Sequence, residues 1–314
     1  MNIPYISTKG MSREEWLEKR RDGIGGSDAA AIMGKSQWAS PLSVYLDKIG
    51  AAPDKPETEA MKQGTAFEEA VAQRFTEETG IKVKRCHKMF SHPEYPWMRA
   101  NIDRQLVGWD GFCGLECKTT SVYNKTDFAG SEIPPTYYWQ CMHYMAVTGA
   151  QQWYLAVMVL SQSFHVFRIP RDDNAIAALI EREKAFWEQH VEKRIPPYPT
   201  GTDADDEAIT IINGGAVIDA SISIDDIAGD LDALAFLEAD LAEAQKKVDA
   251  AKQMIKMRMG NCTEGITRNW RVTYREQTSN RIDSKRLQAE MPDIYSRYTK
   301  PSTSRVLRIK REAI

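Results

Sequence analysis

The stretch Trp97–Ser121, WMRANIDRQLVGWDGFCGLECKTTS, decides the fold that we expect for this chain. Two runs of β-type residues, 101–107 and 112–120, flank the tetrapeptide Gly-Trp-Asp-Gly at 108–111. A short loop rich in Gly and Asp between two such runs is typical of an antiparallel hairpin. The sequence therefore predicts a β-hairpin here.

The turn of this hairpin sets which side chains face one another. If Trp109 and Asp110 form a two-residue turn, Asp103 lies directly opposite Glu116, with Cβ atoms about 5 Å apart. Lys118 is two residues beyond Glu116 and therefore lies on the same face. A slip of one residue in the register would remove this pairing.

Two carboxylates that face each other repel, so a purely structural role for them is hard to supply. A divalent cation removes the conflict, and Mg²⁺ prefers oxygen ligands, often one or two carboxylates with waters and phosphate oxygens. A lysine beside them can stabilise a hydroxide nucleophile or the charge that develops on phosphate. The pattern favours metal-assisted phosphodiester hydrolysis. A surface hairpin with an exposed Glu/Lys pair is the alternative.

Helices are expected on both sides of the hairpin. Residues 64–80, GTAFEEAVAQRFTEETG, predict a helix in which Glu68 lies beside an apolar stripe. That stripe is formed by Phe67, Ala70, Val71 and Phe75. Residues 134–149 predict an aromatic helix that carries Tyr137, Gln140 and Tyr144, with an ordinary core helix as the alternative. A buried strand at Trp153–Leu160 and an amphipathic helix at 173–192 complete the order helix, hairpin, helix, strand, helix.

The segment 12–34, SREEWLEKRRDGIGGSDAAAIMG, contains a possible anion site. Ser12 and Glu15 form a capping-box pattern, and the helix that they begin is expected to end near Arg20 and Arg21. Glycines follow, and Ser27 stands where the N-cap of the next helix is expected. A glycine-rich loop that leads into a helix N-terminus can bind an anion. An ordinary capped loop that binds no anion is the alternative.

Composition sets the broad class. The chain has 314 residues, 42% hydrophobic and 27% charged, as in ordinary globular proteins. No stretch approaches about 18 consecutive apolar residues. The first residues lack the basic and apolar regions of a signal peptide, so we expect a cytoplasmic protein. The five cysteines form no regular framework, and we expect free thiols.

The charge is unevenly distributed along the chain. The net charge is −3, yet residues 200–245 contain twelve acids and no Lys or Arg, whereas residues 265–314 contain twelve Lys/Arg and five acids. Any contact with nucleic acid should therefore be local. We expect a domain over 1–198, an acidic linker over 199–230 and a C-terminal region over 231–314.

The C-terminal region is expected to begin with a long helix from about Leu231 to Met259, followed by short basic strands at 269–276 and 304–312. Apolar residues repeat in the helix at alternating steps of three and four, as in a heptad seam. The seam consists of Leu234, Leu237, Leu241, Ala244, Val248, Ala251 and Ile255. Packing within its own domain and association with a partner helix both remain open. A further short strand is possible at 216–224.

Taken in order, these segments resemble the lambda-exonuclease/YqaJ viral recombinase family of the PD-(D/E)xK nuclease superfamily. The resemblance covers about residues 12–195 and rests on WLEKRRDGIGGSDAAAIMG, GTAFEE, Asp103, LECK and YYWQCMHYMAVTG. It implies an α/β (α+β) restriction-endonuclease-like core, with a central mixed β-sheet flanked by helices and a C-terminal helical and small β extension.

The resemblance also implies site residues. Asp103, Glu116 and the backbone carbonyl of Cys117 would be the metal ligands, and Lys118 would position the nucleophilic water. Glu68 would be an acid near the metals, and Gln140 would lie at the rim of the site beside Tyr137, a candidate DNA contact. Arg20 and Ser27 would bind the terminal 5′-phosphate.

The activity implied is a Mg²⁺-dependent 5′-to-3′ exonuclease of double-stranded DNA that makes 3′ overhangs for recombination. Two metal ions, substitution by Mn²⁺, a homotrimer and a single-strand annealing protein as partner are implied with it, in a phage or prophage protein of a bacterial host. Two alternatives are a PD-(D/E)xK endonuclease and a non-catalytic adaptor that binds DNA ends. A CRISPR-adaptation-type nuclease would need four cysteines around an iron–sulfur cluster, and the cysteine spacing here disfavours it.

Overall fold

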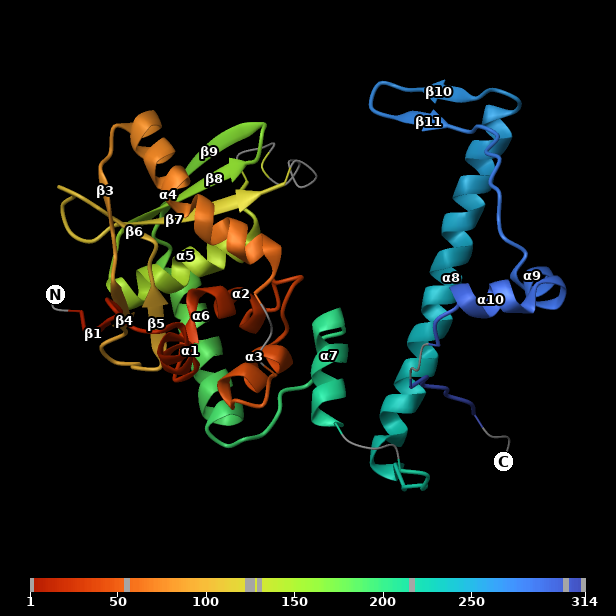
Figure 1. Ribbon diagram of the computed structural model, residues 1–314, viewed down its shortest axis with the longest axis horizontal. Coiled ribbons are helices and arrows are strands. Elements are labelled where there is room, and N and C mark those ends of the chain that lie inside the picture. The colour runs from red at the N-terminus through yellow and green to blue at the C-terminus, as the bar shows by residue number, and fades with distance from the viewer. Residues whose placement is uncertain are drawn as a thin grey trace. The chain divides into compact units, whose positions relative to one another are not determined.

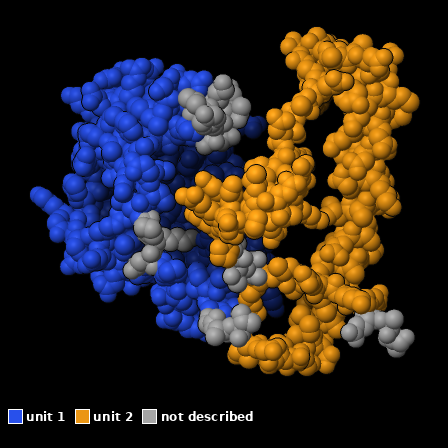
Figure 2. Space-filling model, turned by 45° about the vertical axis from the view of Figure 1, so that its right-hand side comes forward, with its two compact units in different colours: residues 1–217 blue, residues 218–314 orange. Residues whose placement is uncertain are grey.

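A computed structural model describes residues 3–53, 57–121, 128, 132–214, 218–301 and 305–311. The chain divides into two compact units, residues 1–217 and 218–314, which Figure 1 shows as ribbons and Figure 2 in separate colours. The boundary lies inside the span that we predicted as a linker. Each unit is described by itself below.

A five-stranded mixed sheet forms the centre of the first unit (Figure 1). Its strands, in spatial order, are β3 (Val83–Arg85), β6 (Arg104–Leu106), β7 (Gly114–Thr120), β8 (Gln152–Val159) and β9 (Ser163–Pro170). The pair β7–β8 is parallel and the other pairs are antiparallel. The predicted class, a mixed sheet flanked by helices, is confirmed.

The register of the β6–β7 hairpin is the one predicted. Arg104 pairs with Leu115 and Gln105 with Gly114, so Asp103 comes next, opposite Glu116. The first strand is shorter than predicted, because Met98–Asn101 is a separate strand, β5, in another sheet. The chain leaves one sheet and enters the next at residues 102–103, and this places Asp103 at the start of the hairpin.

Helices cover the two faces of this sheet (Figure 1). Side chains alternate along a strand, so Leu115, Tyr154 and Ala156 pack with α4 (Glu59–Thr79), while Trp153, Leu155 and Val157 belong to the core cluster of the opposite helix, α5 (Pro135–Thr148). Beside α5 lies α6 (Asp173–Phe186), which continues as a π-helix over Trp187–Val191.

The apolar face of α4 differs in part from the predicted one. Val71 and Phe75 are fully buried, as expected, together with Ala72. Phe67 is 38% exposed and Ala70 is also exposed. The buried residues of this 21-residue helix all lie in its C-terminal half, and in the N-terminal half the contacts with the sheet include ion pairs of Glu68 and Glu69.

A second, four-stranded sheet was not predicted. Its strands, in order, are β1 (Tyr5–Ser7), β4 (Lys88–Ser91), β5 (Met98–Asn101) and β2 (Ile24–Gly25). Strands of two to four residues are too short to show a period of two in the sequence. Helix α1 (Arg13–Arg21) contacts β2, helix α2 (Gly26–Ile32) packs against this sheet and against α5, and helix α3 (Pro41–Lys48) packs against α2.

The predicted acidic linker contains a packed helix, α7 (Asp203–Ile212). Ala208 is buried in a cluster with α3, and Asp205 is buried at the first turn. Asp205 accepts hydrogen bonds from the backbone N–H groups and hydroxyls of Thr200 and Thr202. The acidic residues of this segment belong to a packed helix, so the prediction of a linker over residues 203–212 is wrong.

The second unit is built around α8 (Ala228–Met259), which agrees with the predicted long helix (Figure 1). After it come β10 (Glu264–Ile266), β11 (Arg271–Thr273), α9 (Ser284–Glu290) and α10 (Pro292–Tyr298). Residues 218–224 and 305–311 form no strand, so the strand predictions at 216–224 and 304–312 are wrong where they can be compared. Among the described residues, no helix is both long and apolar enough to cross a membrane.

Candidate active site

Strand β7 carries the centre of the site. Glu116 is 2% exposed, and its Oε1 lies 2.6 Å from Nζ of Lys118. The other oxygen, Oε2, is buried and has no hydrogen-bond partner. Across the hairpin, Oδ2 of Asp103 accepts a hydrogen bond of 2.8 Å from the backbone N–H of Cys117. The structure thus brings Asp103, Glu116 and Lys118 together, as the sequence predicts.

Burial and neighbouring charges shift the pKa values of this group. Burial raises the pKa of Asp103 well above its usual value, and the neighbouring Glu116 carboxylate raises it further. Burial alone would lower the pKa of Lys118, but the carboxylates of Glu116 and Asp103 outweigh it and raise that pKa. Lys118 therefore remains a cation, and the cluster still has one more carboxylate than it has lysines.

These residues fit a small divalent cation. A buried carboxylate oxygen without a partner is costly unless something positive meets it, and Oε2 of Glu116 is such an oxygen. Among the described residues no group of three or more His, Cys, Asp or Glu side chains is arranged to hold a metal. Two carboxylates are sufficient for Mg²⁺, which keeps several waters and takes further oxygens from phosphate.

Helix α5 supplies the residues that orient Glu116. Nε2 of Gln140 donates to Oε1 of Glu116 at 2.7 Å and to the Tyr144 hydroxyl at 2.8 Å. Gln140 is buried, so it lies deeper than the rim position that we predicted. Tyr137 is closer to the rim, with its ring centroid 5.4 Å from Nζ of Lys118.

Glu68 lies on α4 near Asp103, whose pKa it helps to raise. Its carboxylate is paired with Arg104, which also contacts Glu69 at 3.1 Å. The Arg104 side chain is 3% exposed. Sequence reasoning missed this arginine, although its position directly after Asp103 on a half-buried strand was the available indication.

The N-terminal segment brings Arg20 and Ser27 together. The Ser12–Glu15 capping box forms as predicted, and α1 ends at Arg21. Nη2 of Arg20 donates to the hydroxyl of Ser27 at 2.7 Å. Ser27 is not the N-cap of α2, however. Gly25 is the N-cap, because Asp28 accepts the Gly25 N–H at 2.9 Å and performs the capping, which leaves the Ser27 hydroxyl available to Arg20.

Asp28 was not singled out in the sequence, and it anchors this segment. Its carboxylate lies 2.7 Å from Nζ of Lys48 and 3.5 Å from Arg20. Burial would raise the pKa of Asp28, but Lys48 and Arg20 outweigh it and lower that pKa to about 2. Asp28 is therefore a fixed anion that holds Arg20 in place.

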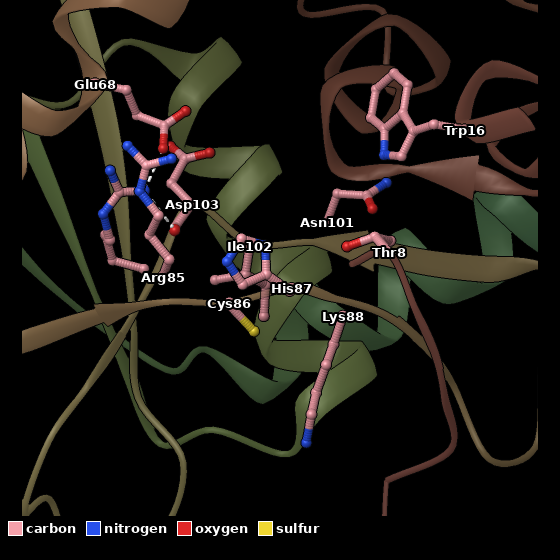
Figure 3. A pocket seen from close by; sticks show the side chains of 11 residues that line it. Thr8, Trp16, Glu68, Arg85, Cys86, His87, Lys88, Asn101, Ile102 and Asp103 are labelled. Carbon is pink, nitrogen blue, oxygen red and sulfur yellow. Dashed lines mark hydrogen bonds and ion pairs between the residues drawn. The ribbon is translucent and has the colours of Figure 1, made fainter. Parts of the chain in front are cut away.

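A pocket of about 220 Å³ is lined by Asp103 and Glu68 and by Trp16 of α1 (Figure 3). Figure 3 shows Asp103 and Glu68 on one side of it and Trp16 on the other. The Arg20 guanidinium lies 5.6 Å from the Trp16 ring centroid. The remaining lining residues include Arg85 of β3, Lys88 of β4 and His87 between the two strands. One concave surface thus extends from the carboxylates to the helix that carries Arg20.

Comparison with known proteins assigns this chain to a family. Residues 15–151 match the family model of the YqaJ-like viral recombinase domain. The uncharacterized protein YqaJ of Bacillus subtilis is 34% identical over 306 residues, which cover 96% of this chain and 95% of that protein. The chain belongs to the YqaJ-like viral recombinase family.

A solved structure agrees with the fold of the first unit. The structure of LHK-Exo in complex with dAMP aligns with a TM-score of 0.50 and 24% identity, covering 58% of this chain and 94% of that one. A second structure of LHK-Exo, described as an alkaline exonuclease from Laribacter hongkongensis, aligns with a TM-score of 0.49 over the same shares. The fold of LHK-Exo is therefore shared over about three fifths of this chain, and the remaining two fifths lie outside the match.

Proposed function

We propose that this protein is a Mg²⁺-dependent 5′-to-3′ exonuclease of double-stranded DNA. It would leave 3′ single-stranded overhangs for homologous recombination by strand annealing. The observation that carries the proposal is the group of Asp103, Glu116 and Lys118, in which Glu116 is buried and has an unpartnered oxygen. Membership of a viral recombinase family and the alkaline exonuclease fold of LHK-Exo support it.

Asp103, Glu116 and the backbone carbonyl of Cys117 would hold the metal. Mg²⁺, or Mn²⁺ in its place, would supply an activated water and neutralise charge on the scissile phosphate. Two such ions would be held in one site. Lys118, which remains protonated, would orient that water and stabilise the developing charge. Gln140 would keep the Glu116 carboxylate in one orientation. Glu68 would be an acid near the metals once its ion pair with Arg104 is broken or shared with the metals.

The direction of cleavage would be set by the terminal phosphate. Arg20 and the Ser27 hydroxyl present a cation and a hydroxyl donor at 2.7 Å from each other, next to the N-terminus of α2. Such a group suits a phosphate. With the 5′-phosphate held there, the pocket beside Trp16 would accommodate the terminal nucleotide, and Tyr137 would contact the duplex near the reacting bond.

The partners follow from the same proposal. Double-stranded DNA ends are the substrate, the active form is a homo-oligomer, by resemblance a trimer, and a single-strand annealing protein takes up the 3′ overhang. The family resemblance supports these assignments, which concern a phage or prophage protein acting in a bacterial host.

The decisive experiment is digestion of duplex DNA with Mg²⁺. Linear DNA with 5′-phosphate ends, the same DNA with 5′-hydroxyl ends and covalently closed circles are compared. Mononucleotide release from the phosphorylated ends, slower release from hydroxyl ends and intact circles are expected. Cleavage of the circles would instead support an endonuclease and remove the reason for a phosphate site at Arg20.

Lys118→Ala separates an enzyme from an adaptor that only binds ends. The substitution should abolish digestion while end binding is retained, and Lys193→Ala, at an exposed lysine of the same unit, serves as the control. If wild-type protein binds ends but neither it nor Lys118→Ala digests DNA, the adaptor interpretation replaces the proposal.

A further inference from the structure

Helix α8 has an apolar seam that its own unit leaves open. None of its described residues is buried. The seam residues Leu237, Leu241, Val248 and Ile255 are 62%, 70%, 46% and 48% exposed. Helices in proteins gain most of their stability by packing an apolar face against another surface. A 32-residue helix with such a seam therefore needs a second surface to pack against.

The charges of α8 are sorted along its length. Residues 228–243 contain five acids and no Lys or Arg, and residues 244–259 contain five Lys/Arg and one acid. A second copy in the antiparallel direction brings each acidic half against a basic half, whereas a parallel copy aligns like with like. We propose that α8 pairs with α8 of a second copy of this chain in an antiparallel coiled coil.

The heptad positions agree with this orientation. With Leu234 and Leu237 at positions a and d, Asp240 and Lys247 both occupy position g. Flanking charges at e and g set partner choice and orientation. When Leu241 lies opposite Ala244 of the second copy, six core layers are apolar, because Leu234 faces Ala251, Leu237 faces Val248 and Leu241 faces Ala244, each twice. Beyond these layers Ile255 faces Asp230. Asp240 then lies beside Lys247 of the second copy, on both sides of the symmetric pair.

A parallel pair lacks these advantages. There position g of one helix meets position e of the next heptad in the other, so Lys247 would meet Lys252 of the second copy. Asp240 would meet only the neutral Gln245. The same helix is therefore complementary to itself in one direction only.

Charge reversal tests the pairing in the full-length chain. Asp240→Lys and Lys247→Asp should each weaken self-association roughly 10-fold, because each places like charges together twice per pair. The double variant should return to within about twofold of wild type. Leu241→Glu in the seam should abolish the association made through α8 and leave any oligomer of the nuclease unit intact, whereas Phe236→Glu on the outer face, 67% exposed, should change neither. An additive double variant, or equal effects of the two Glu variants, would overturn the proposal.

Cross-linking tests the direction independently of any oligomer formed by the nuclease unit. In a Cys262→Ser background, Ala233→Cys and Met254→Cys lie about 30 Å apart on one helix, so a short bis-maleimide can join them only between chains. Mixing the two single variants should give a cross-linked dimer, and each variant alone should give none. Cross-linking of a single variant with itself would indicate a parallel pair, and no product in the mixture would exclude the pairing. Neither result would bear on the nuclease proposal.

Discussion

Nε2 of Gln140 lies 2.7 Å from Oε1 of Glu116, the same oxygen that Lys118 approaches to 2.6 Å. A buried carboxylate held by an amide on one side and an ammonium on the other has little freedom to rotate. Its second oxygen, Oε2, is left as the one available to a ligand. Gln140 is thus a positioning residue for Glu116.

Gln140→Ala should therefore lower the rate of DNA digestion about 10- to 100-fold, as loss of a residue that orients a metal ligand typically does. It should also raise the Mg²⁺ concentration needed for half-maximal activity, which a purely structural defect would not do. Titration of Mg²⁺ in the digestion assay measures both. Gln162→Ala, on the exposed β8–β9 turn, is the matched control. A wild-type rate for Gln140→Ala would show that Glu116 needs no such support.

Asp103→Asn should separate metal binding from folding. In the absence of metal the substitution removes one of two facing carboxylates and retains an oxygen to accept the Cys117 N–H. We expect the melting temperature in EDTA to rise by about 2–4 °C, equivalent to about 1 kcal/mol. The additional stabilisation that Mg²⁺ gives to wild type should be largely lost. Thermal unfolding with EDTA and with Mg²⁺, using Asp110→Asn in the exposed turn as control, checks this. An undiminished Mg²⁺ effect in Asp103→Asn would place the metal elsewhere.

Close approach of α2 to α5 requires a glycine. A Cβ on Gly26 would lie 2.5 Å from the Tyr144 ring, whose hydroxyl accepts a hydrogen bond from Gln140. Gly26→Ala should therefore destabilise the protein by about 1–3 kcal/mol and reduce digestion as Tyr144 shifts. Gly64→Ala, in helix α4 with no atom within 4 Å of the added Cβ, should stabilise it by about 0.5–1 kcal/mol. Urea unfolding measures the free energy of unfolding of the two variants. Equal changes in both would contradict the prediction.

The site was predictable where its geometry is local in sequence. Asp103 and Glu116 are brought together by one hairpin, and the register of a hairpin follows from its turn and its pattern. Glu116 and Lys118 share a face because they are two residues apart on one strand. The arrangement of these three residues needed no knowledge of the rest of the chain.

Tertiary contacts between distant segments were not predictable in the same way. Arg104 is buried against Glu68, 36 residues earlier, and Lys48 reaches Asp28 from another helix. The N-cap of α2 was misplaced at Ser27 because Asp28 competes for the same role from within the first turn. Helix α7 was missed because its acidic residues are typical of an exposed, solvated segment. The sequence did not show that Asp205 accepts hydrogen bonds from the two threonines that precede it.

Asp205 makes the attachment of α7 sensitive to acid. Burial would raise its pKa, but hydrogen bonds from Ser40, Thr202 and Thr200 lower it from 3.8 to about 2. Because the folded pKa lies below the unfolded one, this carboxylate stabilises the fold fully above pH 4 or so. The contribution is about 2 kcal/mol and is lost as the pH falls through about 2.

Asp205→Asn should accordingly reduce the free energy of unfolding by about 2 kcal/mol at pH 7, and the difference from wild type should shrink between pH 4 and pH 2. Asp206→Asn, at the exposed neighbouring position on the same helix, should change stability little at either pH. Urea unfolding at pH 7 and pH 3 measures both variants. If the deficit of Asp205→Asn were the same at both pH values, its cause would be lost packing of α7 and not the charge of the carboxylate. In that case the low pKa of Asp205 would contribute nothing to the free energy of unfolding.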